Sequence, residues 1–382
     1  MKVVFFSNFL THHQLPFCLE MQKRLGENYW FVATERLANE QKMLGYDDLN
    51  ERYPFVLKAY EGEEKKQAAL KLAMEADVVI FGSAPIEYVQ ERLKKKKITF
   101  CYSERLYKSG FSLLRYPVRL MRFFNRYGKY KSFYLLCASA YTAADFAKSF
   151  CFINKAYKWG YFPEVKVYEN PDVLISEKKP GSILWAGRFI DWKHPEYVVE
   201  VARRLRADGY TFHIQMLGNG EKHEEIQKLV SAYGLEPYVT LTGAIPSEQV
   251  RSYMEQAQIY LFTSDRHEGW GAVLNESMNS GCTVVASDAI GAVPFLLDNG
   301  KNGLTYHSGD VADLYQKVKS LLDQPDECNR LGANAYTTMT GTWNAEIAAE
   351  RVIHLSNRLL RGEKHPYPYT DGPCSKADIL KG

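Results

Sequence analysis

Long hydrophobic segments are missing from this chain of 382 residues, and their absence limits what the protein can be. No apolar run reaches 18 residues, so the sequence predicts no transmembrane helix. Residues 1–10 resemble a weak signal sequence, but they lack an extended basic region and an A-x-A cleavage site, which favours a buried first strand. With 46% hydrophobic and 24% charged residues, the composition is that of an ordinary globular protein and excludes a disordered chain, a collagen-like chain and a coiled coil.

Closely spaced cysteines are also missing. The seven cysteines include no C-x-x-C pair and mostly lie in apolar runs, which is typical of reduced core thiols in a cytoplasmic protein. The sequence contains no D-x-D motif, and its nine histidines form no ligand pattern. We therefore expect neither a dedicated metal site nor a tightly bound cofactor.

A strong excess of either charge is absent, since the formal net charge is +3. This small value excludes a composition suited to binding polyanions such as nucleic acid. The charge is divided unevenly, because residues 1–172 contain 27 Lys and Arg against 19 Asp and Glu, whereas the remainder contains 21 against 26. The two halves are therefore expected to face different partners.

Apolar runs typical of strands alternate with amphipathic stretches typical of helices. In the second half the strand-like runs are 183–189, 212–217, 239–242, 259–263, 283–286 and 304–306. In the first half they are 3–7, 30–33, 78–82, 99–102 and 134–138. This alternation predicts an α/β fold with two doubly wound, Rossmann-like domains, each built on a parallel sheet. Ligands of such sheets bind beyond the carboxyl ends of the strands.

The predicted domain boundaries follow from composition. We expect an N-terminal domain over residues 1–172 and a C-terminal domain over residues 173–342, because the polar stretch 169–181 contains two prolines and precedes a new strand. A helix pattern follows within residues 343–364. Residues 365–382 are expected to be a loosely ordered tail.

The strongest chemical signal is the stretch 263–280, which reads TSDRHEGWGAVLNESMNS. A buried strand leads into a loop that contains Glu268 and Gly271, a helix begins near Ala272, and Glu276 lies just over one turn inside that helix. Glycine lets the backbone approach a ligand, the amides of a helix start favour an anion, and carboxylates accept hydrogen bonds from diols. By themselves, the two glutamates do not establish a ligand site. One could equally be a charge at the start of a helix and the other a solvated side chain.

Two cations follow the first strand of the second half, in the stretch GRFIDWK at residues 187–193. Arg188 offers a fork for two phosphate oxygens and Lys193 a compact charge, which together would neutralise a diphosphate. Taken alone, the pair is also explained as ordinary surface cations at the end of a strand.

Together, these elements resemble motifs of the family 4 retaining glycosyltransferases, whose two-domain fold is called GT-B. The glutamate stretch resembles the family's E-x7-E element, and residues 187–193 resemble its G-R-x4-K loop. Residues 291–304 resemble its G-G-x-P…N-G-L stretch, although Ala292 replaces a glycine and Phe295 stands where a glutamate is common. The helix pattern after residue 343 resembles the closing helix that crosses back onto the first domain. The resemblance extends to glycosyltransferases of bacterial capsular polysaccharide and exopolysaccharide synthesis.

The resemblance implies a donor site for a nucleotide-diphosphate sugar, with a UDP-sugar preferred and a GDP-sugar as the alternative. Glu276 would hold the ribose hydroxyls and Glu268 would contact the transferred sugar. Arg188 and Lys193 would bind the diphosphate and support a retaining, front-face reaction. The other donor-site residues that the resemblance implies are Gly271, Ala272, Val273, Leu274, Gly218, Gly243, Ala244 and Ile245.

The first half matches the family only in outline. Residues 8–14, NFLTHHQ, stand where relatives carry a glycine pair, and they resemble the start of a subset of bacterial polysaccharide glycosyltransferases. His12 and His13 are therefore candidates for contacts with an acceptor or a phosphate, although local packing explains them equally well. The stretch 101–105 lacks the histidine of many relatives. Within it, Glu104 could orient an acceptor hydroxyl or form an ion pair with Arg105 or another neighbour.

A basic and aromatic segment covers residues 105–131, with eight Lys and Arg, seven Phe and Tyr, and no acid. On a helix, Arg115, Arg119, Arg122 and Arg126 would form one cationic stripe. Such a segment fits the headgroup layer of an anionic membrane. The alternative is an amphipathic surface helix whose arginines are only solvated, and nucleic acid is not an expected partner.

These patterns lead us to expect a glycosyltransferase that extends an oligosaccharide or polyprenyl-diphosphate-linked acceptor in bacterial surface polysaccharide synthesis. It would be cytoplasmic and peripheral to the inner face of the membrane. The alternatives are a sugar-nucleotide epimerase or a phosphorylase of the same architecture, and a non-catalytic protein that only binds a nucleotide sugar.

Overall fold

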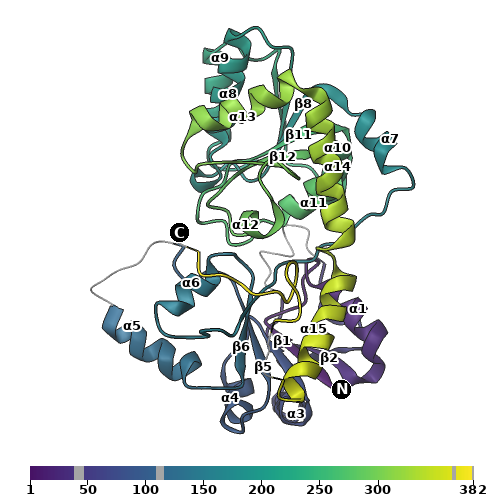
Figure 1. Cartoon of the computed structure of the whole chain (residues 1–382), viewed down its shortest axis with the longest axis vertical. Coiled ribbons are helices and arrows are strands. Elements are labelled where there is room, and N and C mark those ends of the chain that lie inside the picture. The colour runs from purple at the N-terminus through teal and green to yellow at the C-terminus, as the bar shows by residue number, and fades with distance from the viewer. Residues whose placement is uncertain (38–46, 109–115, 364–366, 381–382) are drawn as a thin grey trace. The chain divides into compact units, whose positions relative to one another are not determined.

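A computed structural model describes residues 1–37, 47–108, 116–363 and 367–380. The chain divides into two compact units. The first contains residues Met1–Glu164 and Asn344–Gly382, and the second contains Val165–Trp343. Each unit is a parallel sheet with helices on both faces (Figure 1), so the predicted α/β fold with two Rossmann-like domains is confirmed.

The first unit contains a seven-stranded parallel sheet in the order β3-β2-β1-β4-β5-β6-β7. Its strands are β1 (Val3–Ser7), β2 (Tyr29–Ala33), β3 (Val56–Lys58), β4 (Val78–Phe81), β5 (Thr99–Ser103), β6 (Phe133–Cys137) and β7 (Ala156–Lys158). Its helices are α1 (Leu15–Leu25), α3 (Glu63–Glu75), α4 (Glu87–Lys94), α5 (Tyr116–Phe123), α6 (Thr142–Ala147) and α15 (Ala345–Leu360). The strand interiors are apolar and buried, as expected for a sheet covered on both faces.

The second unit contains a six-stranded parallel sheet in the order β10-β9-β8-β11-β12-β13. Its strands are β8 (Lys179–Ala186), β9 (His213–Leu217), β10 (Val239–Gly243), β11 (Ala257–Phe262), β12 (Thr283–Ser287) and β13 (Leu304–Tyr306). Its helices are α7 (Pro171–Ser176), α8 (Pro195–Ala207), α9 (His223–Ala232), α10 (Ser247–Gln256), α11 (Val273–Asn279), α12 (Val293–Leu296), α13 (Val311–Asp323) and α14 (Pro325–Gly341).

Both sheets have a switch point, where successive crossovers leave in opposite directions. In the first sheet β1 lies between β2 and β4, and in the second sheet β8 lies between β9 and β11. The loops that follow strands at a switch point diverge and leave room for a ligand. The two loops with the strongest sequence signals follow β8 and β11, which places them together at this point of the second sheet.

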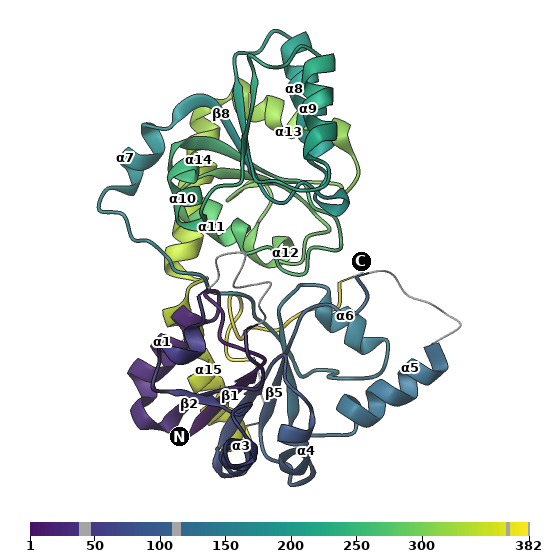
Figure 2. The same cartoon turned by 180° about the vertical axis from the view of Figure 1, so that it is seen from behind.

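The break between the units falls after residue 164, whereas the sequence suggested residue 172. Residues that precede the expected join are already held by the second unit. Lys166 donates through its backbone to Asn279 Oδ1 at 2.8 Å, and the Tyr168 hydroxyl donates to Glu255 Oε1 at 2.7 Å. Figures 1 and 2 show α15 beside α1 within the first unit, where Arg24 approaches Glu346 at 3.6 Å.

The C-terminal segment is not the loosely ordered tail that its sequence suggested. Residues 374–377 run antiparallel to β7, with hydrogen bonds from the Cys374 amide to the Lys158 carbonyl and from the Lys158 amide to the Ser375 carbonyl, both at 2.8 Å. Cys374 is fully buried. The C-terminal segment thereby pairs with β7, an edge strand of the first sheet, and supplies hydrogen-bond partners to backbone groups of that strand.

All seven cysteines are buried and unpaired, in agreement with the expectation of core thiols. Burial raises the pKa of several of them, including Cys18 to about 12 and Cys328 to about 11. Within the described ranges, no helix has the length and apolarity that crossing a membrane requires.

Candidate active site

Three loops of the second unit are joined by backbone hydrogen bonds just beyond the ends of β8, β9 and β10. The Gly187 amide donates to the Leu217 carbonyl at 3.0 Å, and the Gly218 amide donates to the Gly243 carbonyl at 2.8 Å. Gly218 has a φ of +123°, and a Cβ at this position would lie 1.9 Å from the Gly187 carbonyl oxygen. Only glycine fits here. The glycines that the sequence singled out thus give these loops one continuous backbone surface.

The loops after β8 and β11 are tied together by a buried side-chain relay. Trp185 Nε1 donates to Thr263 Oγ1 at 2.8 Å, and Thr263 Oγ1 donates to the Lys193 carbonyl at 2.6 Å. The Asp265 amide donates to the Trp192 carbonyl at 2.9 Å. These contacts fix the backbone of Lys193 opposite the glutamate loop, although the two segments are about 70 residues apart in sequence.

Lys193 and Glu268 form an ion pair at the centre of the site. Lys193 Nζ donates to Glu268 Oε2 at 2.5 Å, and Ser264 Oγ donates to the same oxygen at 3.0 Å. Their side chains are only 14% and 12% exposed, so water screens their attraction less than at an open surface. The sequence indicated both residues separately, but it did not indicate that they contact each other or that Ser264 joins them.

Gly271 brings the backbone close to this ion pair. Its φ is +90°, and a Cβ would lie 2.5 Å from the Phe262 ring and 3.2 Å from Glu268 Cγ. The helix α11 follows, with Ala272 as its N-cap and Val273 as its first residue. The side chain of Leu274 is fully buried, so only its backbone is available to a ligand.

Glu276 lies on α11 without a hydrogen bond to its carboxylate from any described residue. Burial raises the pKa of Glu276, and the charge of Arg251 offsets part of this effect. Its carboxylate oxygens are not buried away from solvent, so the side chain is available to accept hydrogen bonds from a ligand's hydroxyl groups.

Arg188 and Lys193 flank the Trp192 ring. The Arg188 guanidinium carbon lies 5.9 Å from the ring centroid and Lys193 Nζ lies 4.8 Å from it. Arg188 is exposed, and among the described residues no acid lies within ion-pair distance of it. The structure therefore brings the two predicted cations together and leaves one of them free to bind an anion.

The loop after β10 lies beside the other two loops of the second unit. Gly243 has a φ of +79°, and the next residues are an exposed Ala244 and a half-buried Ile245. Because the Gly218 amide holds the Gly243 carbonyl, this loop is adjacent to the loop after β9. Among the described residues, no cluster of three or more His, Cys, Asp and Glu side chains is arranged to hold a metal ion.

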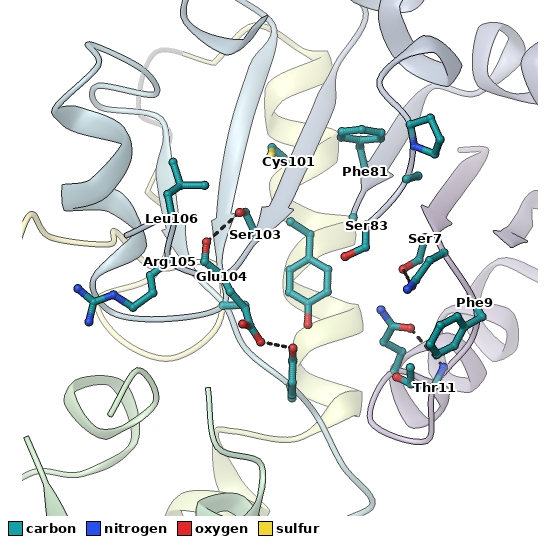
Figure 3. Close-up of a pocket in the computed structure, with 18 of the residues that line it drawn as sticks. Ser7, Phe9, Thr11, Phe81, Ser83, Cys101, Ser103, Glu104, Arg105 and Leu106 are labelled. Atoms are coloured by element: carbon teal, nitrogen blue, oxygen red, sulfur yellow. Dashed lines mark hydrogen bonds between the residues drawn. The ribbon is translucent and has the colours of Figure 1, made fainter. Parts of the chain in front are cut away.

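The first unit has a cavity of about 820 Å³ beyond the carboxyl ends of β1, β4 and β5 (Figure 3). We call it the acceptor cavity, after the role that the sequence analysis expects for Glu104. His13, Ser83, Glu104, Arg105 and Tyr161 are among the residues that line it. His12 is not one of the lining residues, although its ring centroid lies 3.8 Å from that of His13.

Glu104 is the charged centre of the acceptor cavity. Its carboxylate accepts hydrogen bonds from the Tyr161 hydroxyl and from Lys108 Nζ. The His13 ring stacks on Tyr161 with centroids 5.6 Å apart. Burial, with a smaller effect from His12, lowers the pKa of His13 to about 3, so this ring is neutral. Tyr161 had no signal in the sequence, because it lies outside every motif and reaches the cavity only through the fold.

The basic segment forms α5 and a π-helical turn at Phe124–Gly128, and its two sides differ. Arg119, Arg122 and Arg126 line a second cavity of the first unit, whereas Val118 and Met121 are 72% and 65% exposed. Arg115 lies outside the described residues. The predicted cationic stripe is therefore present over the described part of the segment, and it faces a hollow of the protein.

A family model described as "Glycosyl transferases group 1" matches residues 168–338. The matched residues all lie within the second unit, which also contains the Lys193–Glu268 pair.

Two curated relatives have related sequences. Alpha-D-kanosaminyltransferase of Streptomyces kanamyceticus is 28% identical over 177 residues, which are 46% of this chain and 45% of that protein. Poly(ribitol-phosphate) alpha-N-acetylglucosaminyltransferase of Staphylococcus aureus is 28% identical over 196 residues, which are 50% of this chain and 38% of that protein. The chain thus matches less than half the length of these relatives.

The fold of the whole chain is shared with a solved structure. The crystal structure of Anabaena Alr3699/HepE in complex with UDP has a TM-score of 0.68 at 14% identity, covering 93% of this chain and 99% of that one. The architecture is therefore that of the GT-B glycosyltransferases.

Proposed function

We propose that the protein is a retaining glycosyltransferase of family 4 type that transfers a sugar from a nucleotide-diphosphate sugar to an acceptor hydroxyl. The observation that carries this proposal is the cluster of Lys193, Glu268 and Gly271 at the switch point, with Arg188 and Glu276 beside it, inside the group 1 glycosyltransferase domain. Two cations for phosphate oxygens and two carboxylates for hydroxyl groups are what a sugar nucleotide requires.

The donor is assigned to the second unit. Arg188 and Lys193 bind the diphosphate, and the amides of Gly271, Ala272 and Val273 add donors from the start of α11. Glu276 accepts hydrogen bonds from the ribose. The loops at Gly218 and at Gly243, Ala244 and Ile245 hold the base through backbone groups, with uracil favoured over guanine because the solved neighbour contains UDP.

Transfer breaks the bond between the sugar's anomeric carbon and the diphosphate oxygen, which keeps the electron pair. The acceptor oxygen forms the new bond on the same face, and its proton passes to the departing phosphate. Lys193 and Arg188 lower the energy of the charge that develops on that phosphate. Glu268 holds Lys193 in place before the donor binds, and it contacts the transferred sugar. The two relatives named for alpha products support retention, because the common hexose nucleotides are themselves alpha-linked.

The acceptor is assigned to the first unit. The acceptor cavity presents Glu104, held by Tyr161 and Lys108, to an incoming hydroxyl group. The Staphylococcus aureus relative is named for a polymeric acceptor, which favours an oligosaccharide or polymer here, carried on a polyprenyl diphosphate. The apolar side of α5, with Val118 and Met121 exposed, would dock on the inner face of an anionic membrane while the neighbouring arginines meet anionic groups.

Titration calorimetry with UDP and GDP, followed by incubation with a panel of UDP- and GDP-sugars, tests the donor assignment. We expect UDP binding and slow hydrolysis of one UDP-sugar without an acceptor. Arg188→Gln should weaken UDP binding about tenfold or more, because a charge-assisted hydrogen bond is lost. Arg203→Gln, on the remote α8, is the matched control and should leave UDP binding unchanged.

The alternatives give different results in the same experiment. An epimerase would convert a sugar nucleotide into its isomer without releasing UDP, and a non-catalytic binding protein would bind without turnover. If neither UDP nor GDP binds, or if Arg188→Gln and Arg203→Gln behave alike, the proposed function is wrong.

A further inference from the structure

A second cavity, of about 500 Å³, lies beside the acceptor cavity in the first unit, and we call it the arginine cavity. It is lined by Arg105, Leu106, Tyr107, Lys108, Arg119, Arg122, Phe123 and Arg126. Five of these eight residues are cations, and none is an acid. Positive charges gathered in a cavity focus the electrostatic potential there and favour the binding of an anion.

The cations of the arginine cavity are only partly neutralised by the protein. Lys108 is paired with Glu104, and Arg105 Nε lies 3.8 Å from Asp145 Oδ2. Asp145 Oδ2 also accepts hydrogen bonds from the amides of Leu106 and Tyr107, at 2.9 and 3.1 Å. Asp145 therefore holds the loop in place as well as facing Arg105.

Three guanidinium groups have no acidic partner. Within the described part of the chain, no carboxylate lies within ion-pair distance of Arg119, Arg122 or Arg126. Lys148 lies close to them, with its Nζ 5.2 Å from the Tyr107 ring, which Arg119 also approaches at 5.6 Å, but Lys148 is paired with Asp145 at 3.5 Å. Like charges held this close repel one another, and a bound anion would relieve that repulsion.

Two buried nitrogens of this cluster also lack a hydrogen-bond acceptor. The Nε atoms of Arg105 and Arg126 are buried without a partner, and the Arg105 side chain is only 9% exposed. These two guanidinium groups are therefore not fully satisfied by hydrogen bonds within the protein. Figure 3 shows Arg105 and Glu104 leaving the same loop in different directions, so the acid does not cover the guanidinium.

The arginine cavity adjoins the acceptor cavity, because Arg105, Leu106, Lys108 and Arg126 line both. A single molecule can therefore place a hydroxyl group near Glu104 and an anionic group among the arginines. Planar guanidinium forks are suited to phosphoryl oxygens, which they bind through paired hydrogen bonds.

We infer that the arginine cavity is a binding site for a phosphoryl group of the acceptor, a diphosphate in particular, held by Arg119, Arg122, Arg126 and Arg105. This inference rests on the proposed function and specifies its acceptor as a phosphorylated molecule. It also changes the role of the arginine stripe: these side chains bind one phosphoryl group inside the protein, while the apolar side of α5 remains available to a surface.

Titration calorimetry of the full chain with inorganic pyrophosphate tests the site. The wild-type protein should bind pyrophosphate at two sites, one in each unit. Arg119→Gln with Arg122→Gln should weaken one site about tenfold or more, whereas Arg188→Gln with Lys193→Gln should weaken only the other. Lys65→Gln with Lys95→Gln is the control. It removes two exposed cations of the first unit that line neither cavity, and it should leave pyrophosphate binding at both sites unchanged.

A second experiment distinguishes a lipid source from a soluble one. Phosphatidylcholine vesicles that contain either a long-chain polyprenyl diphosphate or the corresponding polyprenol are sedimented with the protein. A lipid-linked acceptor predicts binding to the diphosphate vesicles that Arg119→Gln with Arg122→Gln abolishes and Lys65→Gln with Lys95→Gln does not. If pyrophosphate binding depends on these arginines but the two vesicles bind equally, the phosphoryl group belongs to a soluble acceptor.

The outcomes separate this inference from the proposed function. If Arg119→Gln with Arg122→Gln leaves both pyrophosphate sites intact in a variant with the wild-type circular dichroism spectrum, the inference is overturned and the donor site stands. If only the Arg188 and Lys193 substitutions are without effect, the arginine cavity stands and the donor assignment fails.

Discussion

Replacing Glu276 by Gln should make the free protein more stable and make it bind UDP more weakly. Burial raises the pKa of this carboxyl above its ordinary value of 4.5, and Arg251 offsets the rise only in part. The folded state therefore holds the proton more tightly than the unfolded state. Stability is consequently lost as the pH rises through the interval between the unfolded and the folded pKa, and this loss persists at neutral pH.

The size of the effect follows from the linkage between pKa and stability. Because the folded pKa is raised, Glu276→Gln should raise the free energy of unfolding at pH 7. For a domain of this size, each 1 kcal/mol of added stability raises the melting temperature by about 2–4 °C. Loss of hydrogen bonds from ribose to a charged acceptor, at about 1.5–3 kcal/mol each, should weaken UDP binding by roughly tenfold or more.

Thermal unfolding with and without UDP measures both quantities in one assay. Glu255→Gln is the matched control, because the pKa of Glu255 is lowered, not raised. Burial acts to raise this pKa, but hydrogen bonds from Lys166 and Tyr168 outweigh the effect of burial. The control should therefore lower the melting temperature at pH 7 and leave the stabilisation by UDP unchanged. A Glu276→Gln variant that melts earlier than the wild type and retains full stabilisation by UDP would refute the reasoning.

Three further predictions concern the packing of both units. Gly218→Ala should destabilise the protein by about 1–3 kcal/mol in urea unfolding, because its Cβ would lie 1.9 Å from the Gly187 carbonyl oxygen; an unchanged midpoint would contradict the described loop. Trp185→Phe removes the hydrogen bond to Thr263 and should cost about 1–3 kcal/mol while weakening UDP binding, and equal UDP affinity would mean that this relay does not position the site. The pKa of His13 is lowered to about 3, so the ring stays neutral in the folded state and the protein should lose stability as the pH drops from about 6.5 towards 3. His13→Asn should reduce this loss of stability in acid, as measured by the melting temperature at a series of pH values. A melting temperature that depends on pH as in the wild type would contradict the assignment.

The loops that carry the candidate donor residues were predictable because these residues lie in short motifs at strand ends. Strands β8 and β11 are apolar runs followed by loops with glycines and charges, and a parallel sheet brings such loops to one edge. The pairing of Lys193 with Glu268 was not predictable, because it depends on the relay through Thr263 between segments that are distant in sequence.

The cavities of the first unit were harder to predict for a physical reason. A helical stripe of arginines looks the same in sequence whether it faces water, lipid or a hollow of the protein, and only the position of the loop at Arg105 shows that Arg119 and Arg122 line a cavity. Likewise, the composition of the C-terminal segment gave no sign of pairing, since its polar residues and prolines are typical of loops, yet backbone hydrogen bonds to β7 hold it in place.

The reactivity of the buried cysteines can be used to measure local unfolding of each unit. Cys282 and Cys328 lie in the second unit and the other five lie in the first, all shielded from solvent. An alkylating reagent should therefore modify each sulfur only when the surrounding fold loosens, and peptide mass analysis would assign every event to one unit. The order in which the two sets react would show which unit opens first.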